Sequence, residues 1–199
     1  MEITNKVKKT VILGINGSGK TYFTKKNYLD KERYHFIVDP NREYSGGYNR
    51  YMPKITQDQK QLNAELELVI KRFVNHNAPM MESKRKVKHP LELFAIDEAD
   101  LFAPSRQNLP YALHRLLVEC RHRGNGLDLL FITRRPTDLN AKIMDLADEI
   151  IVFCQTGVNA IKRLDSLSQG LGQAAANLDY DLHEYLVVNR KREYTKVTP

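Results

Sequence analysis

Short apolar runs alternate along the chain with longer amphipathic stretches. The runs are rich in Val, Ile, Leu and Phe, and such runs between polar, glycine or proline positions predict buried strands. The predicted strands are residues 7–13, 34–39, 91–96, 127–133, 149–154 and 185–189. Alternation of strands with helices favours an α/β fold, with a mainly parallel central sheet and helices on both faces.

The stretches between these strands carry apolar residues at helical spacing. Residues 56–59 read Thr-Gln-Asp-Gln, a capping-box pattern that is expected to open a helix. The predicted helices are residues 22–29, 56–73, 108–124, 137–146 and 158–178, the last interrupted near Gly170 and Gly172. Their core-facing positions include Leu62, Leu66, Ile70, Phe73, Leu113, Leu116, Leu117 and Cys120. Residues 41–53 and 78–90 follow no period and are predicted loops, and a basic tail is expected after the last strand.

Residues 14–21 read Gly-Ile-Asn-Gly-Ser-Gly-Lys-Thr and fit G-x-x-x-x-G-K-[ST], the phosphate-binding P-loop, at every fixed position. A buried strand precedes the motif and a helix follows it, which favours a P-loop over an ordinary glycine-rich turn. Lys20 is expected to reach the β- and γ-phosphates of a nucleoside triphosphate, and Thr21 to bind Mg²⁺. The predicted nucleotide contacts are Gly14, Asn16, Gly17, Ser18, Gly19, Lys20, Thr21 and Tyr22.

Two acidic residues, Asp97 and Glu98, directly follow the predicted strand at residues 91–96. In a P-loop ATPase, a carboxylate at the end of a buried strand orients the hydration shell of Mg²⁺. The adjacent Glu98 is expected to point toward the γ-phosphate, where it can orient and deprotonate a water molecule. The alternative is that both residues only cap the segment that follows.

Arginines occur at two further positions where chemistry is possible. Arg121 and Arg123 flank His122 at the end of a predicted helix, where they either interact with the helix dipole or include an arginine finger that reaches the γ-phosphate of a neighbouring subunit. Arg134 follows the strand that ends at Thr133, at the edge of the sheet where ligands bind in open α/β folds. It is expected either to sense the γ-phosphate or simply to leave the sheet for solvent.

Composition narrows the partners and the compartment. No apolar run approaches the length of a membrane span and no signal peptide is recognisable, so a cytoplasmic protein with no membrane contact is expected. Two cysteines are too few for a disulfide framework. The formal net charge of +7 permits binding to nucleic acid. A basic run in the loop at 78–90 is either solvated surface or a contact to DNA phosphates, formed by Lys84, Arg85, Lys86 and Lys88.

Taken together, four segments resemble the FtsK–HerA superfamily of ring-forming P-loop ATPases that pump DNA. They are the P-loop at 14–21, the Phe-Ala-Ile-Asp-Glu-Ala run at 94–99, the Arg-His-Arg-Gly run at 121–124 and the Phe-Ile-Thr-Arg-Arg-Pro run at 131–136. The likeness extends from about residue 7 to residue 189. It implies a RecA-like core with strand order 5-1-4-3-2, and a single P-loop ATPase domain over residues 1–199.

The resemblance also assigns roles. It implies that Lys20 and Thr21 form Walker A, that Asp97 and Glu98 form Walker B, and that Arg121 is the trans finger. Relatives usually carry a glutamine sensor where this chain has Arg134. The chain is little more than a motor core, which favours a viral genome-packaging type.

The predicted function is therefore ATP hydrolysis with Mg²⁺, coupled to DNA translocation by a homo-oligomeric ring. Viral capsid or portal-vertex proteins are possible partners of such a motor. Two alternatives stay open at this point: a P-loop kinase acting on a nucleoside or small metabolite, and an assembly protein that binds ATP as a switch with little hydrolysis.

Overall fold

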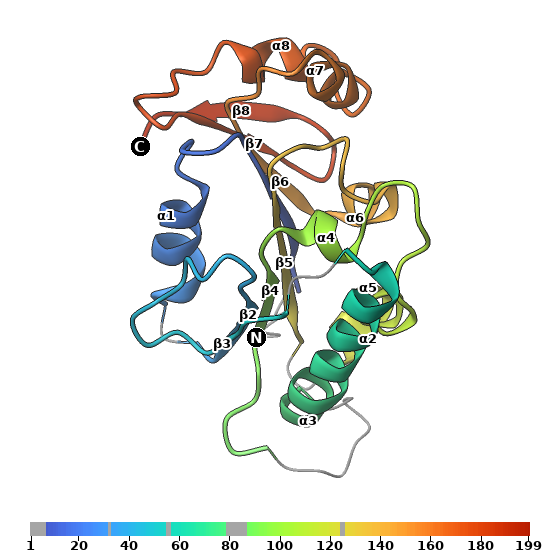
Figure 1. The fold of residues 1–199 in the computed structure, drawn as a ribbon. Coiled ribbons are helices and arrows are strands. Elements are labelled where there is room, and N and C mark those ends of the chain that lie inside the picture. The colour runs from blue at the N-terminus through green and yellow to red at the C-terminus, as the bar shows by residue number, and fades with distance from the viewer. Residues whose placement is uncertain (1–6, 32, 55–56, 79–86, 124–125) are drawn as a thin grey trace.

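The computed structural model describes residues 7–31, 33–54, 57–78, 87–123 and 126–199, and within them eight strands form one sheet in the order β3-β2-β4-β5-β1-β6-β7-β8. The sheet stands upright in Figure 1, with helices to both sides of it. The strands are β1 (Lys9–Leu13), β2 (His35–Val38), β3 (Arg50–Tyr51), β4 (Leu93–Ile96), β5 (Asp128–Thr133), β6 (Glu149–Phe153), β7 (Tyr185–Val188) and β8 (Tyr194–Val197).

The central part of this sheet is parallel. Strand β1 pairs with β5 on one side and β6 on the other, and β4 pairs with β5 and β2, all in parallel register. Numbered along the chain without the edge strand β3, the order is 5-1-4-3-2, so the strand order implied by the resemblance is confirmed. Strands β7 and β8 continue the sheet beyond β6 as an antiparallel pair.

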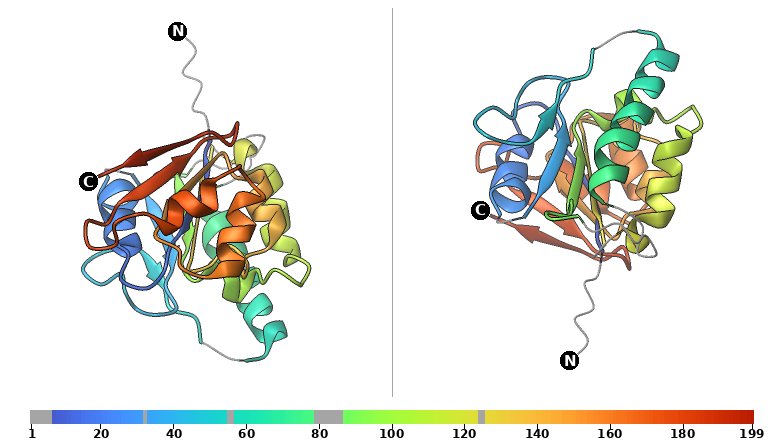
Figure 2. Two further views of the ribbon diagram at one scale, coloured as in Figure 1. Left: turned by 90° about the horizontal axis from the view of Figure 1, so that it is seen from above. Right: turned by 90° about the horizontal axis from the view of Figure 1, so that it is seen from below.

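Helices cover both faces of the sheet. Helix α1 (Lys20–Thr24), continued by the π-helical turn η1 (Lys25–Leu29), lies on one face, and most of the other helices lie on the opposite face (Figures 1 and 2). The remaining helices are α2 (Gln59–Val69), η2 (Ile70–Val74), α3 (Asn75–Asn77), α4 (Ala99–Phe102), α5 (Tyr111–Glu119), η3 (Cys120–His122), α6 (Ala141–Leu146), α7 (Val158–Asp165) and α8 (Leu171–Ala176).

Alternate residues of β1 contribute to two separate hydrophobic clusters. Val11 and Leu13 belong to the larger cluster, under α2, α5 and α6, whereas Ile12 belongs to the smaller one, under α1. Successive side chains of a strand point to opposite faces, so a strand buried on both sides must be apolar at nearly every position. This explains why the central strands read as continuous apolar runs.

Several sequence expectations are wrong in detail. The predicted loop at 41–53 contains the edge strand β3, and the predicted basic tail contains β8. Helix α2 begins at Gln59, with Asp58 at its N-cap accepting a hydrogen bond from the Lys60 backbone N–H; Thr56 lies outside the described residues. The helix expected from residue 137 begins at Ala141, because Asn140 caps it. The other predicted strands and helices are present.

Phe73, expected in the core, is 38% exposed, although its ring stacks on Phe36 with centroids 4.8 Å apart. Phe73 lies in the π-helical turn η2. The change from α-helical to π-helical geometry shifts the buried side of the helix, so Val74 is buried instead. In the described part of the chain, no helix combines the length and apolar character needed to cross a membrane.

The packing of α8 against α7 generates a stability prediction. A Cβ atom on Gly172 would lie 2.2 Å from the carbonyl oxygen of Ile161, a backbone atom that cannot move aside cheaply. Gly172→Ala should therefore lower the free energy of unfolding by about 1–3 kcal/mol, as overpacking does elsewhere. Urea denaturation measures the change. Gly157→Ala is the control, since its Cβ would meet only the Ala160 Cβ at 3.8 Å. Gly157 is the N-cap of α7, where Ala is a poorer cap, so the control should lose about 0.5–1 kcal/mol. A loss in Gly172→Ala no larger than that of the control would contradict the prediction.

Candidate functional site

Loops that follow four neighbouring strands meet at the carboxyl edge of the sheet. They enclose a cavity of about 430 Å³ above the ends of β1, β2, β4 and β5. In open parallel sheets, this edge is where ligands bind. The cavity is lined by Asn16, Gly17, Gly19, Lys20, Thr21, Tyr22, Glu43, Asp97, Glu98, Arg134 and His183. Most of the residues predicted from the P-loop motif, and both acids at 97 and 98, therefore line one cavity.

The loop between β1 and α1 owes its shape to two glycines with left-handed backbone. Gly17 has φ 75° and Gly19 has φ 99°. A Cβ on Gly17 would lie 2.1 Å from the Tyr180 hydroxyl, which donates a hydrogen bond to the Asn16 carbonyl (2.9 Å). Such a loop, leading into a helix N-terminus, presents backbone N–H groups to an anion.

Gly14 and Ser18 lie beneath this loop rather than in the cavity lining. Ser18 is 1% exposed, and its backbone N–H is directed to the Ile15 carbonyl at 3.3 Å. A Cβ on Gly14 would lie 2.5 Å from the Ser18 hydroxyl oxygen. These two residues therefore shape the loop from below, whereas Tyr22, 66% exposed, borders the mouth of the cavity.

Lys20 is the cation at the base of the cavity. Its ammonium donates to the Ile15 carbonyl at 3.0 Å. Burial lowers the Lys20 pKa, while the nearby charges of Asp97 and Glu98 act in the opposite direction. The side chain thus has a fixed position at the foot of the loop and two acids close by.

Asp97 is the buried acid of the site. It follows β4 directly, is 6% exposed, and its backbone N–H bonds to the Val38 carbonyl of the neighbouring strand at 3.0 Å. Burial, with a smaller contribution from the charge of Glu98, raises the pKa of Asp97 to about 7. The expectation that this residue ends a buried strand is confirmed.

Glu98 points into the cavity from a strained backbone. Its φ of 45° is left-handed, which is uncommon outside glycine, and strain of this kind clusters at functional sites. The Glu98 carboxylate forms an ion pair with Arg134 at 2.7 Å and accepts a hydrogen bond from the Asn41 side chain at 2.9 Å. Glu98 is thus engaged by a cation from the next loop of the sheet.

Arg134 is itself held by neighbours at the ends of β5 and β6. The buried Gln155 donates to the Arg134 carbonyl at 2.9 Å, and Thr133 donates to Asp100 at 2.5 Å. The Arg134 side chain is 47% exposed, and it also lines the cavity and pairs with Glu98.

Glu43 is a site residue that sequence reasoning missed. Its carboxylate accepts a hydrogen bond from the Thr21 hydroxyl at 2.5 Å. The buried Asp39 shapes the loop by accepting from the backbone N–H groups of Glu43 and Tyr44 and pairing with Arg50. A signal did exist: strand order 5-1-4-3-2 places the loop after the second strand beside the acid-bearing third.

His183 was also missed. A Cβ on Gly19 would lie 3.2 Å from the His183 ring, so this side chain rests on the P-loop from above. It belongs to residues 177–184, between α8 and β7, which also supply Tyr180. Residues 177–184 carry no motif. They lie over the P-loop because β7, which follows them, pairs antiparallel with β6.

The residues present fit a Mg²⁺–nucleotide complex. Within the described residues, no group of three or more His, Cys, Asp or Glu side chains could hold a metal ion by itself. Mg²⁺ is typically bound through one or two carboxylates together with substrate phosphates, which suits Thr21 and Asp97 beside a phosphate-binding loop. Asp97 would gain a cation for its buried carboxylate.

The remaining predicted residues lie elsewhere. Arg123 is 6% exposed, bonded to Asn75 at 2.7 Å and paired with Glu119 at 3.1 Å, so it holds α5 against α3. Arg121 is exposed at the amino edge of the sheet, before β5, and does not reach the cavity of its own chain. Lys88 is exposed before β4, at the same edge. Lys84, Arg85 and Lys86 lie outside the described residues.

The buried acid generates a pH prediction. Because the pKa of folded Asp97 is about 7 rather than 3.8, the folded protein retains a proton that the unfolded chain releases between these values. The loss of stability due to Asp97 therefore grows as pH rises from 4 to 7 and is complete above pH 7. Above pH 7, without metal and nucleotide, Asp97→Asn should unfold at a higher temperature than wild type. The gain in the free energy of unfolding should be at most about 4 kcal/mol.

Thermal unfolding in chelator, from pH 4 to 8.5, measures this difference. The gap should narrow as the pH falls toward 4, because the unfolded chain begins to take up the same proton near its ordinary pKa of 3.8. The exposed Asp181 supplies the control, Asp181→Asn, which should give no such pH-dependent gain. An Asp97→Asn variant that gains nothing between pH 4 and 8 would show that Asp97 is not held at a raised pKa.

No protein-family model and no curated protein matches this chain. Solved structures share its fold. The genome packaging NTPase B204 from Sulfolobus turreted icosahedral virus 2, in complex with AMPPCP, is 20% identical with a TM-score of 0.72, over 98% of this chain and 100% of that one. The pCW3 conjugation coupling protein TcpA is 14% identical with a TM-score of 0.61, over 100% of this chain and 62% of that one.

The N-terminal domain of zonular occludens toxin from Neisseria meningitidis is 14% identical with a TM-score of 0.53, over 96% of this chain and 94% of that one. All three are P-loop ATPases of the FtsK–HerA type. Identities this low establish the fold alone. The chain therefore has the α/β fold of FtsK–HerA-type P-loop ATPases, the group that its sequence motifs resemble.

Proposed function

We propose that this chain hydrolyses ATP at the cavity above β1 and β4 and uses the reaction to move DNA during viral genome packaging, as a homo-oligomeric ring. The carrying observation is the convergence of Lys20, Thr21, Asp97 and Glu98 in one cavity. Further support comes from a likeness over nearly the whole of both chains to B204, called a DNA-packaging ATPase. The coupling to DNA and the ring are part of the proposal.

The residues divide the chemistry among themselves. The P-loop backbone and Lys20 would hold the phosphates, with the Lys20 charge placed to stabilise negative charge that develops during transfer. Thr21 and Asp97 would hold Mg²⁺, which would supply positive charge against the negative charge of the phosphates. The Glu43 carboxylate accepts a hydrogen bond from the Thr21 hydroxyl and would orient that hydroxyl.

Glu98 would serve as the general base. Its carboxylate lines the cavity and would orient an attacking water molecule and accept its proton. For that, the carboxylate must be turned to the water rather than held by Arg134 and Asn41. Hydrolysis would therefore require the Glu98–Arg134 pair to open, and Arg134 would then be free to contact the phosphates.

Arg121 could contribute to catalysis only in an oligomer. It is exposed at the edge of the sheet opposite the cavity, so any contribution to catalysis would have to be made to the site of another copy. An arginine supplied in trans increases the rate by about 10³–10⁵ where it has been studied. The basic run at 84–88 remains our prediction for a DNA contact.

The first test measures ATP turnover with and without linear double-stranded DNA at two salt concentrations. Wild type should be stimulated by DNA, and the stimulation should fade as salt rises, because phosphate contacts are salt-dependent. Lys20→Ala should abolish turnover. Glu98→Gln should keep ATP bound while turnover falls by about 10²–10⁴, the range for a positioned general base.

Two outcomes would contradict this function, and a third would contradict the role of Glu98. Turnover that needs a small phosphate acceptor would favour a kinase. ATP binding that changes assembly with almost no turnover would favour an assembly switch. Unchanged turnover in Glu98→Gln would remove Glu98 as the base.

The ion pair that engages Glu98 generates a second prediction. Arg134→Gln should raise ATP turnover in the absence of DNA, because it removes the cation that holds the base. An exposed ion pair is worth about 1 kcal/mol or less, so the increase should be up to about fivefold. The matched control is Arg135→Gln, at the exposed neighbouring arginine. A fall in turnover for Arg134→Gln alone would mean that Arg134 acts chiefly on the phosphates.

A further inference from the structure

A second cavity, of about 450 Å³, lies at the amino edge of the sheet. It is enclosed by the start of β1, the end of α5 with η3, the end of α6 and the turn between β7 and β8. The P-loop cavity follows the carboxyl end of β1, so the two cavities lie at opposite ends of the same strand. Four basic side chains line the second one: Lys9, Arg121, Arg190 and Arg192.

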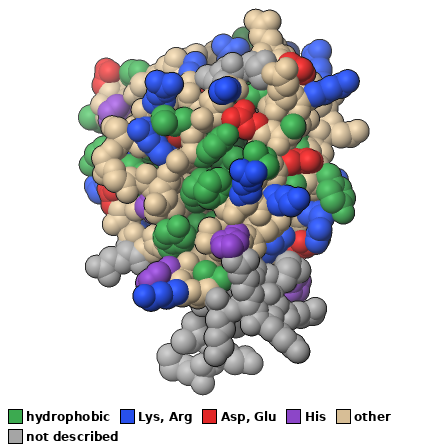
Figure 3. Space-filling view, turned by 60° about the horizontal axis from the view of Figure 1, so that its bottom comes forward, with side chains coloured by type: hydrophobic (Ala, Val, Ile, Leu, Met, Phe, Trp, Pro, Cys, Tyr) green, Lys and Arg blue, Asp and Glu red, His purple; other side chains and the backbone are tan. Residues whose placement is uncertain are grey.

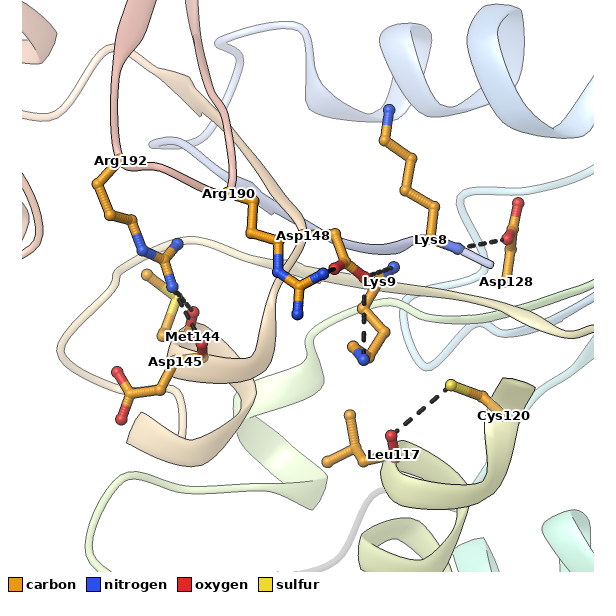
Figure 4. Close-up of polar contacts among 10 residues, drawn as sticks. All are labelled: Lys8, Lys9, Leu117, Cys120, Asp128, Met144, Asp145, Asp148, Arg190 and Arg192. Carbon is orange, nitrogen blue, oxygen red and sulfur yellow. Dashed lines mark hydrogen bonds and ion pairs between the residues drawn. The ribbon is translucent and has the colours of Figure 1, made fainter. Parts of the chain in front are cut away.

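Strand register explains how these residues meet. Thr10 lies beside Glu149, and Ile150 lies beside Val188, so the β7–β8 turn stands next to the amino ends of β6 and β1. Figure 4 shows Arg190 and Lys9 approaching the carboxylate of Asp148 from two sides, with Arg192 directed to the end of α6. The cluster is thus assembled from segments far apart in the sequence.

The cations of this cavity are incompletely neutralised. The Asp148 carboxylate lies 3.7 Å from the Arg190 guanidinium and 3.8 Å from the Lys9 ammonium, both beyond hydrogen-bond distance, and it accepts a hydrogen bond from the Lys9 backbone N–H at 3.1 Å. Arg192 donates to the backbone carbonyls of Met144 (3.1 Å) and Asp145 (3.0 Å). In the part of the chain that the structure describes, neither Arg121 nor Arg192 forms an ion pair with a side chain.

Two observations indicate that the positive charge of this cavity can bind an anion. Lys9 is 8% exposed, and a cation so deeply buried is expensive unless it is fully paired. The Nη1 atom of Arg192 is buried with no hydrogen-bond partner. Counting Asp145 and Asp148 against the four basic residues leaves a surplus of two positive charges around the cavity.

We propose that this cavity is a phosphate-binding site, separate from the P-loop, and that its ligand is a backbone phosphate of DNA. Guanidinium groups suit the purpose, since their planar fork matches phosphate oxygens. Apart from the His122 imidazole, the described lining contains no aromatic ring for a base, as expected of a contact that reads chiefly the backbone. The choice of DNA rests on the proposed function.

The surroundings favour an extended ligand. Arg190 is 66% exposed at its side chain, and the exposed Lys191 continues the turn outward. Around the mouth, Val118 (60% exposed) and Leu146 (40% exposed) offer apolar surface, and Asp145 is the exposed acid of the described lining. On the side that Figure 3 presents, with the bottom of Figure 1 brought forward, Lys and Arg side chains lie around a group of hydrophobic ones.

The test measures binding of a short labelled DNA duplex of mixed sequence to the full chain, by fluorescence anisotropy over a salt series without nucleotide. Arg190→Ala should weaken binding roughly three- to tenfold at low salt and reduce the slope of log affinity against log salt by about 0.9, the value for one phosphate contact. Arg190→Lys keeps the charge and should recover most of the affinity. Arg121→Ala combined with Arg190→Ala should reduce the slope further.

The control is Lys162→Ala, an exposed lysine on α7 outside the cavity lining, which should leave affinity unchanged apart from general charge effects. Lys9→Met is the stricter variant, and Arg190→Ala decides the question if Lys9→Met does not fold. Wild type that binds DNA while Arg190→Ala binds equally well would overturn this site and leave the proposed function standing.

Two other outcomes separate the sources of phosphate. Wild type that hydrolyses ATP but never binds the duplex would overturn both this site and the DNA part of the proposed function. The number of ATP analogue molecules bound per chain tests a nucleotide as the ligand: a second molecule lost in Arg190→Ala would overturn the assignment to DNA.

Discussion

The carboxylate of Asp97, buried at the end of β4, is the constraint on which the site depends. Burial makes its negative charge unfavourable, and Lys20 is the cation of the cavity base that acts against this effect. Glu98 and Glu43 bring further negative charge, while Arg134 offsets Glu98. The cavity thus contains three acids and two bases, a balance that favours a divalent cation accompanied by phosphate over a bare anion. Chemistry of this kind follows from the strand order, because only neighbouring strands could deliver these loops to one place.

The same sheet separates two kinds of charge. Its carboxyl edge gathers the acids together with the P-loop, whereas the amino edge near β1 and β6 gathers Lys9, Arg121, Arg190 and Arg192. Strand β1 connects the two, beginning at Lys9 and leading into the loop at Gly14. The five residues of β1 span about 16 Å. Ligands at its two ends would therefore not touch, although the strand between them is short and rigid. A nucleotide site and a DNA-contacting site on one buried strand would share a framework without sharing a ligand, as a motor requires.

The sequence predicts the central strands well because burial on both faces makes them apolar throughout. It fails for β3 and β8, which are short, partly exposed edge strands with no such requirement. The capping box at residue 56 was a false indication, since Asp58 offers an equally good cap two residues later. Within the site, motif residues were predictable from spacing alone. Glu43, Asn41 and His183 were not, because loops without a motif bring them into contact. Arg123, for which the sequence leaves two roles open, pairs with Glu119 one helical turn away.

The arginine at position 134 has a physical consequence that a glutamine would not have. A glutamine could only donate a neutral hydrogen bond to Glu98, whereas Arg134 forms a charged pair with it. A triphosphate carries more negative charge than one carboxylate, so a bound nucleotide would compete with Glu98 for the same guanidinium. If the proposed function holds, binding would draw Arg134 toward the phosphates and release the base in the same movement. In molecules where Arg134 stays with Glu98 despite the bound nucleotide, the same side chain would restrain hydrolysis. The strained backbone of Glu98 places its carboxylate where both partners can be reached.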